Sequence, residues 1–241
     1  MFIRQGFFVK IEDTGADGHL SDKAILEAMG NTATLHAGSV GQSPEEMDAA
    51  GLAWVITGWK LRVLARPRVF TSFSVGTWVR EMNRVFAYRD FEAYDEEGSV
   101  IAAGSAVCVL IDSKKRVIAR LTPALSDPYE KQPEKKAFGA DITYADPRSV
   151  TVSPVKVKEM EIMRSMIDRN GHVHYSVYLD LAAEALPEEC GLAFENVEIS
   201  FKKEIRPREI VTLEYAAYGD GHCVFIRDGE DKTLHAMILL S

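Results

Sequence analysis

Several features are scarce in this sequence of 241 residues, and each scarcity excludes a class of protein. There are only three cysteines, Cys108, Cys190 and Cys223, with no C-x-x-C pair, so neither a disulfide framework nor a cysteine-ligated metal is expected. The least interrupted apolar run, residues 101–111, falls far short of the about 20 residues that a membrane-spanning helix needs. Basic residues are outnumbered by acidic ones, 28 to 36, which argues against general nucleic-acid binding, because that binding depends on neutralising phosphate.

Signals for targeting and for cofactors are also missing. The segment MFIRQGFFVKIED alternates like a β-strand and has neither an apolar signal core nor a small-residue cleavage site. We therefore expect a cytoplasmic protein with reduced thiols. No glycine-rich phosphate loop is present, so no nucleotide cofactor is expected, and no metal site is expected either. An apolar content of 46% with 27% charged residues is typical of a soluble globular chain.

The sequence contains an internal repeat. Residues 17–20 read DGHL and residues 170–173 read NGHV, an offset of 153 from position 19 to position 172. Residues 65–68 read ARPR and residues 205–208 read IRPR, an offset of 140 from position 66 to position 206. Because the two matches occur in the same order with nearly the same spacing, we interpret the chain as a tandem duplication.

Each half has the same order of predicted elements. A strand (2–11, then 155–167) precedes the Gly-His motif, and a helix of low charge follows it (21–37 with Ser21 as N-cap, then 176–186). Four strands complete each half, over 54–64, 69–79, 84–94 and 99–112, then over 194–205, 210–218, 223–228 and 233–240. This order predicts an α+β protein in which an antiparallel sheet wraps around a central helix, twice.

The expected organisation has three parts. Residues 1–121 form the first half and residues 155–241 the second. Residues 122–154, rich in Pro, Lys and Glu, are predicted to be a linker that is too polar to join either core.

Several motifs resemble those of acyl-acyl-carrier-protein (acyl-ACP) thioesterases, whose fold is a double hot-dog. In the first half these are Trp54–Thr57 (WVIT), Trp59, Arg66–Pro67 and Thr77–Trp78. In the second half they are Asp168–Val173 (D-x-N-x-H-V), Leu179–Pro187 (LDLAAEALP) and Ile199–Glu204 (ISFKKE). The resemblance covers nearly the whole chain and implies a tandem hot-dog fold, each half a sheet around a long central helix.

The chemistry of the second-half motif can be argued from the residues alone. Asp168, Asn170 and His172 alternate along a segment that we expect to be extended, so that all three point to one side. A histidine suits proton transfer near neutral pH, a nearby Asp can orient it, and an Asn offers both a donor and an acceptor. The N-terminus of the following helix would present N–H groups to a developing oxyanion. The alternative is structural, because Asp and Asn before a helix are also common caps.

The first half serves as an internal control. The two offsets map Asp168, Asn170 and His172 to Gly15, Asp17 and His19, and they map Glu204 to Leu64. The first half therefore keeps the histidine without its partners. This favours a single active site in the second half and an inert first half that holds the substrate.

The resemblance implies that Asp168, Asn170, His172 and Glu204 occupy the family's catalytic positions. His172 and Glu204 would activate water for attack on a thioester, Asn170 would orient the water or the carbonyl, and Asp168 would fix its neighbours. Plant members carry a cysteine directly after the Glu; Ile205 stands there, which excludes a cysteine acyl-enzyme at this point. The sequence also departs from the family at positions 174 and 175, where His and Tyr replace two Asn.

Two further groups of residues have weaker assignments. Residues flanking Glu204 are candidates for docking the acidic carrier protein: Lys202, Lys203, Arg206 and Arg208. These basic residues, like Arg66, Arg68 and the run Lys114–Arg116, are also compatible with ordinary solvated faces. Met29 and Trp54 are candidates for acyl binding, although the preferred interpretation of the tryptophans is that they belong to the core of the first sheet. For His19 and His36 a structural role is expected.

The preferred hypothesis is a cytoplasmic hydrolase that releases fatty acids from acyl-ACP, with water as second substrate and no cofactor. One alternative is a hot-dog acyl-CoA thioesterase with the same residues. Others are a hot-dog dehydratase or hydratase and a non-catalytic acyl-binding module. No nucleic-acid or membrane partner is expected, and either a monomer or a homodimer is compatible with a double hot-dog.

Overall fold

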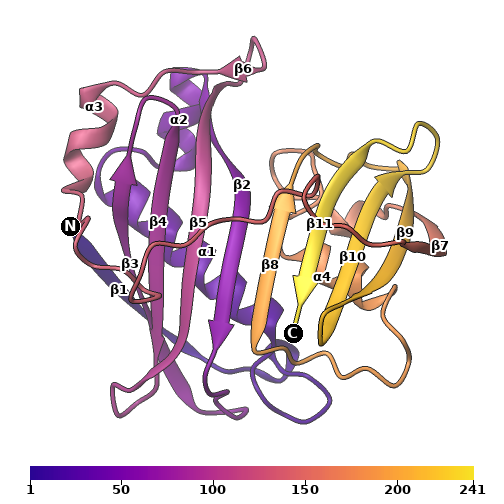
Figure 1. Ribbon diagram of the computed structural model, residues 1–241. Helices are drawn as coiled ribbons and strands as arrows, with labels where there is room; N and C mark the ends of the chain where they lie inside the picture. Colours follow the sequence, from indigo (N-terminus) through magenta and orange to yellow (C-terminus); the bar gives the residue numbers. More distant parts are fainter.

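A single antiparallel sheet of eleven strands runs through the whole molecule in this computed structural model, which describes residues 1–241 (Figure 1). The strand order is β1-β3-β4-β5-β2-β8-β11-β10-β9-β7, with β6 paired to β5. The strands of the first half are β1 (Phe2–Phe8), β2 (Leu52–Val63), β3 (Ser72–Met82), β4 (Phe86–Tyr94), β5 (Val100–Asp112) and β6 (Val117–Ile118). Those of the second are β7 (Val155–Glu161), β8 (Asn196–Phe201), β9 (Ile210–Tyr218), β10 (Gly221–Asp228) and β11 (Leu234–Leu240).

The two halves of this sheet are copies of each other. From the centre outward, β2 corresponds to β8, β5 to β11, β4 to β10, β3 to β9 and β1 to β7. The copies meet where β2 pairs antiparallel with β8, in a register running from Gly58 opposite Ser200 to Arg62 opposite Asn196. The predicted duplication and the α+β double hot-dog architecture are therefore confirmed.

The central helices lie on one face of the sheet (Figure 1). Helix α1 (Asp22–Ser39) begins where predicted, because the Ser21 side chain accepts the N–H of Ala24 at 3.2 Å. Helix α4 (Val177–Ala183) has seven residues and ends earlier than the predicted 176–186. The remaining helices are short: α2 (Pro44–Ala50), α3 (Pro123–Ser126), and 3-10 turns at Ile11–Asp13, Asp127–Tyr129 and Arg164–Met166. None of the helices has the length and hydrophobicity required to span a membrane.

The hydrophobic core is continuous across the two halves. One cluster of 32 buried residues joins side chains of α1 and the first-half strands, such as Met29 and Trp59, to Leu181 of α4 and Ile238 of β11. The repeats therefore share one core, which holds the segments that carry the candidate site in fixed relative positions.

The segment 122–154 is more than a polar linker. It crosses the face of the sheet opposite the helices (Figure 1). Tyr129 is only 1% exposed, Tyr144 donates a hydrogen bond to Ser105 at 3.0 Å, and the indole of Trp78 donates to the carbonyl of Lys135 at 2.8 Å. The prediction that this segment joins neither core was wrong, because average polarity conceals two tyrosines that pack against the first half.

The backbone also corrects the alignment of the repeats. In the second half, the N–H groups of residues 202 and 203 both donate to the carbonyl of His235, at 2.8 and 3.2 Å. In the first half, those of residues 64 and 65 both donate to the carbonyl of Ile101, at 2.8 and 3.1 Å. The structural offset in this region is therefore 138 residues, two fewer than the ARPR and IRPR match predicts.

Candidate active site

Residues 168–172 form a tight turn, whereas the sequence predicted an extended segment. The N–H of Asp168 donates to the carbonyl of His172 at 2.8 Å, and Gly171 adopts a positive φ of 81°, which a side chain would disfavour. The Asp168 carboxylate accepts the backbone N–H of Asn170 at 2.7 Å and its side-chain amide at 3.3 Å. Asp168 and Asn170 thus stabilise the turn that presents His172, and neither caps helix α4, whose N-cap is Ser176.

This turn is joined to the segment that carries Glu204. The N–H of Val173 donates to the carbonyl of Ile205 at 2.9 Å, and both of these side chains are buried. Across the junction, Nε2 of His172 lies 2.9 Å from Oε2 of Glu204. The two side chains are 30% and 25% exposed, so the pair remains within reach of water. The sequence thus correctly predicted which histidine and which carboxylate meet.

Two arginines hold the other oxygen of Glu204. Arg206 donates to Oε1 through Nε at 3.1 Å and through Nη2 at 2.8 Å, and Arg116 donates to the same oxygen. Partial burial acts to raise the pKa of Glu204, but the hydrogen bonds from Arg206 and Arg116 and the charge of His172 outweigh it and hold the pKa below its usual range. Glu204 is therefore a carboxylate at neutral pH.

A cavity of about 470 Å³ opens beside this carboxylate. Its lining is entirely polar and consists of Arg116, Lys203, Glu204, Arg206 and Glu209. Glu204 reaches this cavity from the loop after β8, three residues beyond the end of the strand at Phe201, and not from the strand itself as predicted. The side chains that surround Glu204 are mostly cationic, so the cavity suits a ligand with negative charge.

Residues of the first half take part in the site. Arg116 belongs to the turn between β5 and β6, and it donates a hydrogen bond to Glu204 in addition to being exposed to solvent. Arg169, in the His172 turn, donates to Glu45 and Asp48 of α2, both at 3.1 Å. Local sequence patterns do not reveal these contacts, because the partners lie 88 to 124 residues apart.

The corresponding region of the first half lacks the pair. With the structural offset of 138, Glu204 corresponds to Arg66 and not to Leu64. Arg66 is itself a structural residue, since its guanidinium binds the buried carboxylate of Asp22 at 2.6 Å. The His19 ring lies 3.3 Å from Asp17 of its own turn. Only the second half brings a histidine against a carboxylate of another element.

The helix N-terminus does not supply the expected oxyanion site at its first residue. The N–H of Val177 already donates to the carbonyl of His174 at 3.0 Å, so this donor is occupied. The unusual pair His174 and Tyr175 is engaged elsewhere. Nδ1 of His174 contacts the Ser176 hydroxyl at 2.9 Å, and Tyr175 donates to a carbonyl of α1 at 3.1 Å.

The remaining predicted residues lie at varied distances from the site. Lys202 and Arg208 are exposed near Glu204 but do not line its cavity, unlike Lys203 and Arg206. Met29 is fully buried in the shared core. Trp54 is half-buried beside a separate small cluster formed by Met47, Leu110 and Leu121.

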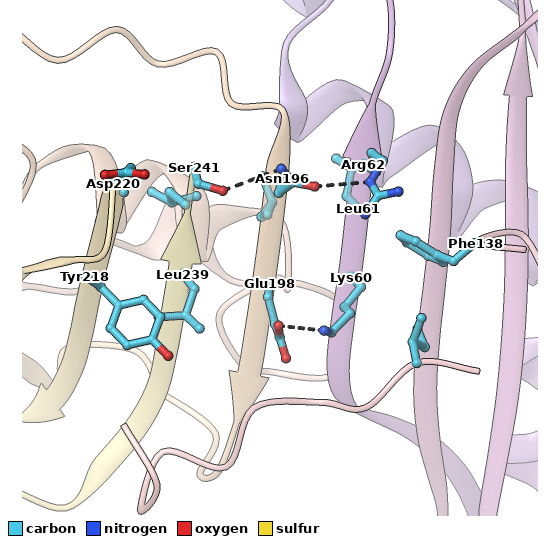
Figure 2. A pocket seen from close by; sticks show the side chains of 14 residues that line it. Lys60, Leu61, Arg62, Phe138, Asn196, Glu198, Tyr218, Asp220, Leu239 and Ser241 are labelled. Carbon is cyan, nitrogen blue, oxygen red and sulfur yellow. Dashed lines mark hydrogen bonds and ion pairs between the residues drawn. The ribbon is translucent and has the colours of Figure 1, made fainter. Parts of the chain in front are cut away.

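A second cavity, of about 560 Å³, lies on the outer face of the sheet where β2 meets β8 (Figure 2). Lys60 and Glu198 form an ion pair across this seam at 2.9 Å, and Arg62 donates to Asn196 at 3.3 Å. None of the residues predicted to be catalytic lines it. It is therefore separate from the His172 and Glu204 pair.

Comparison with solved structures identifies the fold. The fold is that of double hot-dog thioesterases. A crystal structure of an acyl-ACP thioesterase from Bacteroides thetaiotaomicron superposes with a TM-score of 0.86 at 19% identity, covering 99% of this chain and 96% of that one. The 12:0-ACP thioesterase from Umbellularia californica gives a TM-score of 0.79 at 16% identity, covering 100% of this chain and 96% of that one.

The sequence comparison identifies the family. The family model for the acyl-ACP thioesterase N-terminal domain matches residues 2–129, and the chain belongs to the acyl-ACP thioesterase family. Two chloroplastic acyl-[acyl-carrier-protein] hydrolases of Cuphea viscosissima are each 23% identical to it, over 206 and 261 residues. These matches cover 78% and 96% of this chain but 48% and 60% of the relatives, so the chain spans about half the length of the curated relatives that it matches.

Proposed function

We propose that this chain hydrolyses fatty acyl-ACP thioesters in the cytoplasm and releases the free fatty acid. The observation that carries the proposal is the contact of 2.9 Å between His172 and Glu204, formed only in the second half and placed beside a cavity lined by three basic and two acidic residues. Family membership supports the same reaction class.

The charges around the pair suggest how the work is divided. Glu204 is held as a carboxylate by two arginines, which makes it a weak base but a good acceptor for the Nε2–H of His172. In that tautomer the imidazole carries a lone pair on Nδ1. We assign the general base to Nδ1 of His172 and the stabilisation of the resulting imidazolium to Glu204.

The proposed reaction then balances with water alone. Nδ1 of His172 takes a proton from water as the oxygen attacks the thioester carbonyl. The tetrahedral intermediate collapses with cleavage of the C–S bond, and the imidazolium returns the proton to the departing thiolate. Asp168 and Asn170 act as positioning residues, because their mutual hydrogen bonds maintain the turn that holds His172.

The carrier protein is the proposed partner because of the charge at the mouth of the site. Lys203 and Arg206 line the cavity, and Lys202 and Arg208 are exposed beside it. An acidic carrier protein with a phosphate-linked acyl arm would be attracted to such a surface, although the whole chain is acidic.

The test is thiol release from a panel of C8 to C18 acyl-ACP substrates, with the matching acyl-CoAs alongside. His172→Ala and Glu204→Gln are expected to lower kcat/KM by about 100-fold or more, the typical size of a general acid–base contribution. His19→Ala, at the equivalent position of the first half, is the matched control and should retain activity. Thiol release from acyl-CoA but not from acyl-ACP would show that coenzyme A, and not the carrier protein, is the partner. Wild-type activity of His172→Ala would overturn the assignment of His172 as the general base.

A further inference from the structure

Three hydrogen-bond acceptors, each with a lone pair to offer, converge behind the Glu204 loop, and no hydrogen-bond donor lies between them. Nε2 of His235 lies 3.8 Å from Oε2 of Glu209 and 3.9 Å from Oδ2 of Asp228, and all three ligand atoms lie within 4.8 Å of one another. Neither the His235 nitrogen nor the Glu209 oxygen has a hydrogen-bond partner, and both are buried. Buried polar atoms of this kind are rare in folded proteins and call for a partner.

The hydrogen bonding of His235 leaves the lone pair of its Nε2 facing two carboxylates. The His235 side chain is 0% exposed, and its Nδ1 lies 3.3 Å from the carbonyl of Lys203, which can only accept a hydrogen bond. Nδ1 therefore carries a proton, and in the neutral ring Nε2 presents a lone pair to the two carboxylates. Metal-binding histidines are commonly oriented in the same way, by a hydrogen bond that their Nδ1–H donates to a backbone carbonyl.

The internal repeat shows that this arrangement is particular to the second half. The pair β4–β5 in the first half and the corresponding pair β10–β11 in the second each contain a β-bulge. The bulged residue, Ile101 in β5 and His235 in β11, is buried. Glu209 corresponds to Thr71. The Glu209 carbonyl accepts the N–H of Ile162, which follows edge strand β7, and the Thr71 carbonyl accepts the N–H of Val9, which follows edge strand β1. His235 and Glu209 thus stand where the first half has an apolar core residue and a threonine, whereas Asp228 corresponds to Asp95.

The carboxylates are available as ligands. Asp228 accepts the N–H groups of Glu230 and Asp231 through Oδ1, at 2.8 and 3.2 Å, which leaves Oδ2 directed at His235. The nearest cation is the Lys203 ammonium, 3.7 Å from Oδ2 of Asp228, on a side chain that is 42% exposed and can turn to solvent. Two carboxylates and one neutral imidazole together carry two negative charges, which a divalent cation would neutralise.

We propose that Glu209, Asp228 and His235 bind a first-row divalent cation of the Zn²⁺ type. In a tetrahedral site, bonds of about 2.0–2.2 Å place two ligand atoms roughly 3.3–3.6 Å apart. The distances of 3.8 and 3.9 Å from Nε2 would therefore each shorten by a few tenths of an ångström on binding. Because Lys203 adjoins Glu204 and its carbonyl orients His235, the cation would also fix the loop that carries Glu204.

The experiment is equilibrium dialysis of the full chain against Zn²⁺, with metal content measured by mass spectrometry and the Tm measured in parallel. Wild type should hold one equivalent and gain stability on binding. Asp228→Asn and Glu209→Gln should lower the affinity at least tenfold, as should His235→Gln if it folds. Asp95→Asn is the matched control, since Asp95 caps the corresponding turn of the first half, and it should bind as wild type does.

Two results would overturn the proposal. One is the absence of saturable Zn²⁺ binding by wild type. The other is equal binding by wild type and Asp228→Asn, which would place the metal elsewhere, for example at Cys190 and His222, whose Sγ and Nε2 lie 3.3 Å apart. Both readouts are independent of thioester hydrolysis, so the failure of this proposal and that of the proposed function are distinguishable.

Discussion

Arg116, in a turn of the first half, donates a hydrogen bond to Glu204, the carboxylate that faces His172 in the second half. The candidate site is therefore completed by both repeats, even though its histidine and carboxylate come from one. This makes the protonation state of Glu204 sensitive to substitutions in the first half.

Removal of either arginine should raise the pKa of Glu204. Both Arg116 and Arg206 lower it by hydrogen bonding to Oε1, so Arg116→Gln and Arg206→Gln should each shift its titration to higher pH, and the double variant should shift it furthest. The measurement is a ¹³C NMR titration of the Glu204 side-chain carboxyl. Arg62→Gln, on the outer face of the sheet, should leave this titration unchanged.

The buried imidazole of His36 should make stability depend on pH. Burial, with a further contribution from the Arg89 charge, lowers the pKa of His36 to about 3 from a reference of 6.5. Between these values the unfolded chain binds a proton that the folded chain does not, so stability is retained above about pH 6.5 and is lost as pH falls. The loss attributable to His36 is about 2 kcal/mol between pH 7 and pH 5.

Urea denaturation at the two pH values measures this effect. His36→Gln should show a smaller decrease in the free energy of unfolding between pH 7 and pH 5 than wild type does. His19→Gln is the control, because the His19 ring is 31% exposed. An equal decrease in wild type and His36→Gln would contradict the assignment.

The contact between α1 and Tyr175 should make Gly30 intolerant of substitution. A Cβ at Gly30 would lie 1.9 Å from the Tyr175 hydroxyl and 2.8 Å from its Cζ, and that hydroxyl is engaged with the Leu26 carbonyl. Gly30→Ala should therefore destabilise the protein by about 1–3 kcal/mol through overpacking. Thermal denaturation will show this as a lower Tm.

Gly38 provides the comparison within the same helix. A Cβ there meets nothing closer than 3.8 Å, so Gly38→Ala should be neutral or stabilising by up to about 1 kcal/mol, as helix propensity predicts. Combining Gly30→Ala with Tyr175→Phe removes the closest clash and should recover part of the loss. Additive effects in the double variant would show that the two residues do not interact.

Docking of the carrier protein should depend on the exposed basic residues near the site. Lys202→Glu and Arg208→Glu should raise KM for acyl-ACP, most strongly at low salt, and leave kcat nearly unchanged, because rim charges mainly affect association. Activity on acyl-pantetheine, which lacks the protein, should not change. Arg68→Glu, at the first-half position that corresponds to Arg206, is the control; an equal rise in KM there would point to a general effect of net charge.

Much of the fold could be predicted because local patterns and the observed structure agree. Alternation over 210–218 predicted β9 with its observed bounds, and Ser21 caps α1 as expected. The pairing of His172 with Glu204 was also predictable, from a motif whose two parts are brought together by the repeat architecture.

The errors arose where tertiary hydrogen bonds determine the outcome. The similar tetrapeptides ARPR and IRPR aligned the repeats two residues out of register, because backbone pairing at Ile101 and His235 sets the true correspondence. The approach of Arg116 to Glu204 and the burial of Tyr129 depend on contacts between distant segments that local periodicity does not report.

The join between β2 and β8 also has an evolutionary consequence. In a symmetric dimer of identical single-repeat chains, any mutation enters both subunits at once. When both repeats are encoded in one gene, each can mutate independently. In such a homodimer, Arg66 could not differ from Glu204, nor Ile101 from His235. A change at either position would remove an ion pair or a core side chain in both copies.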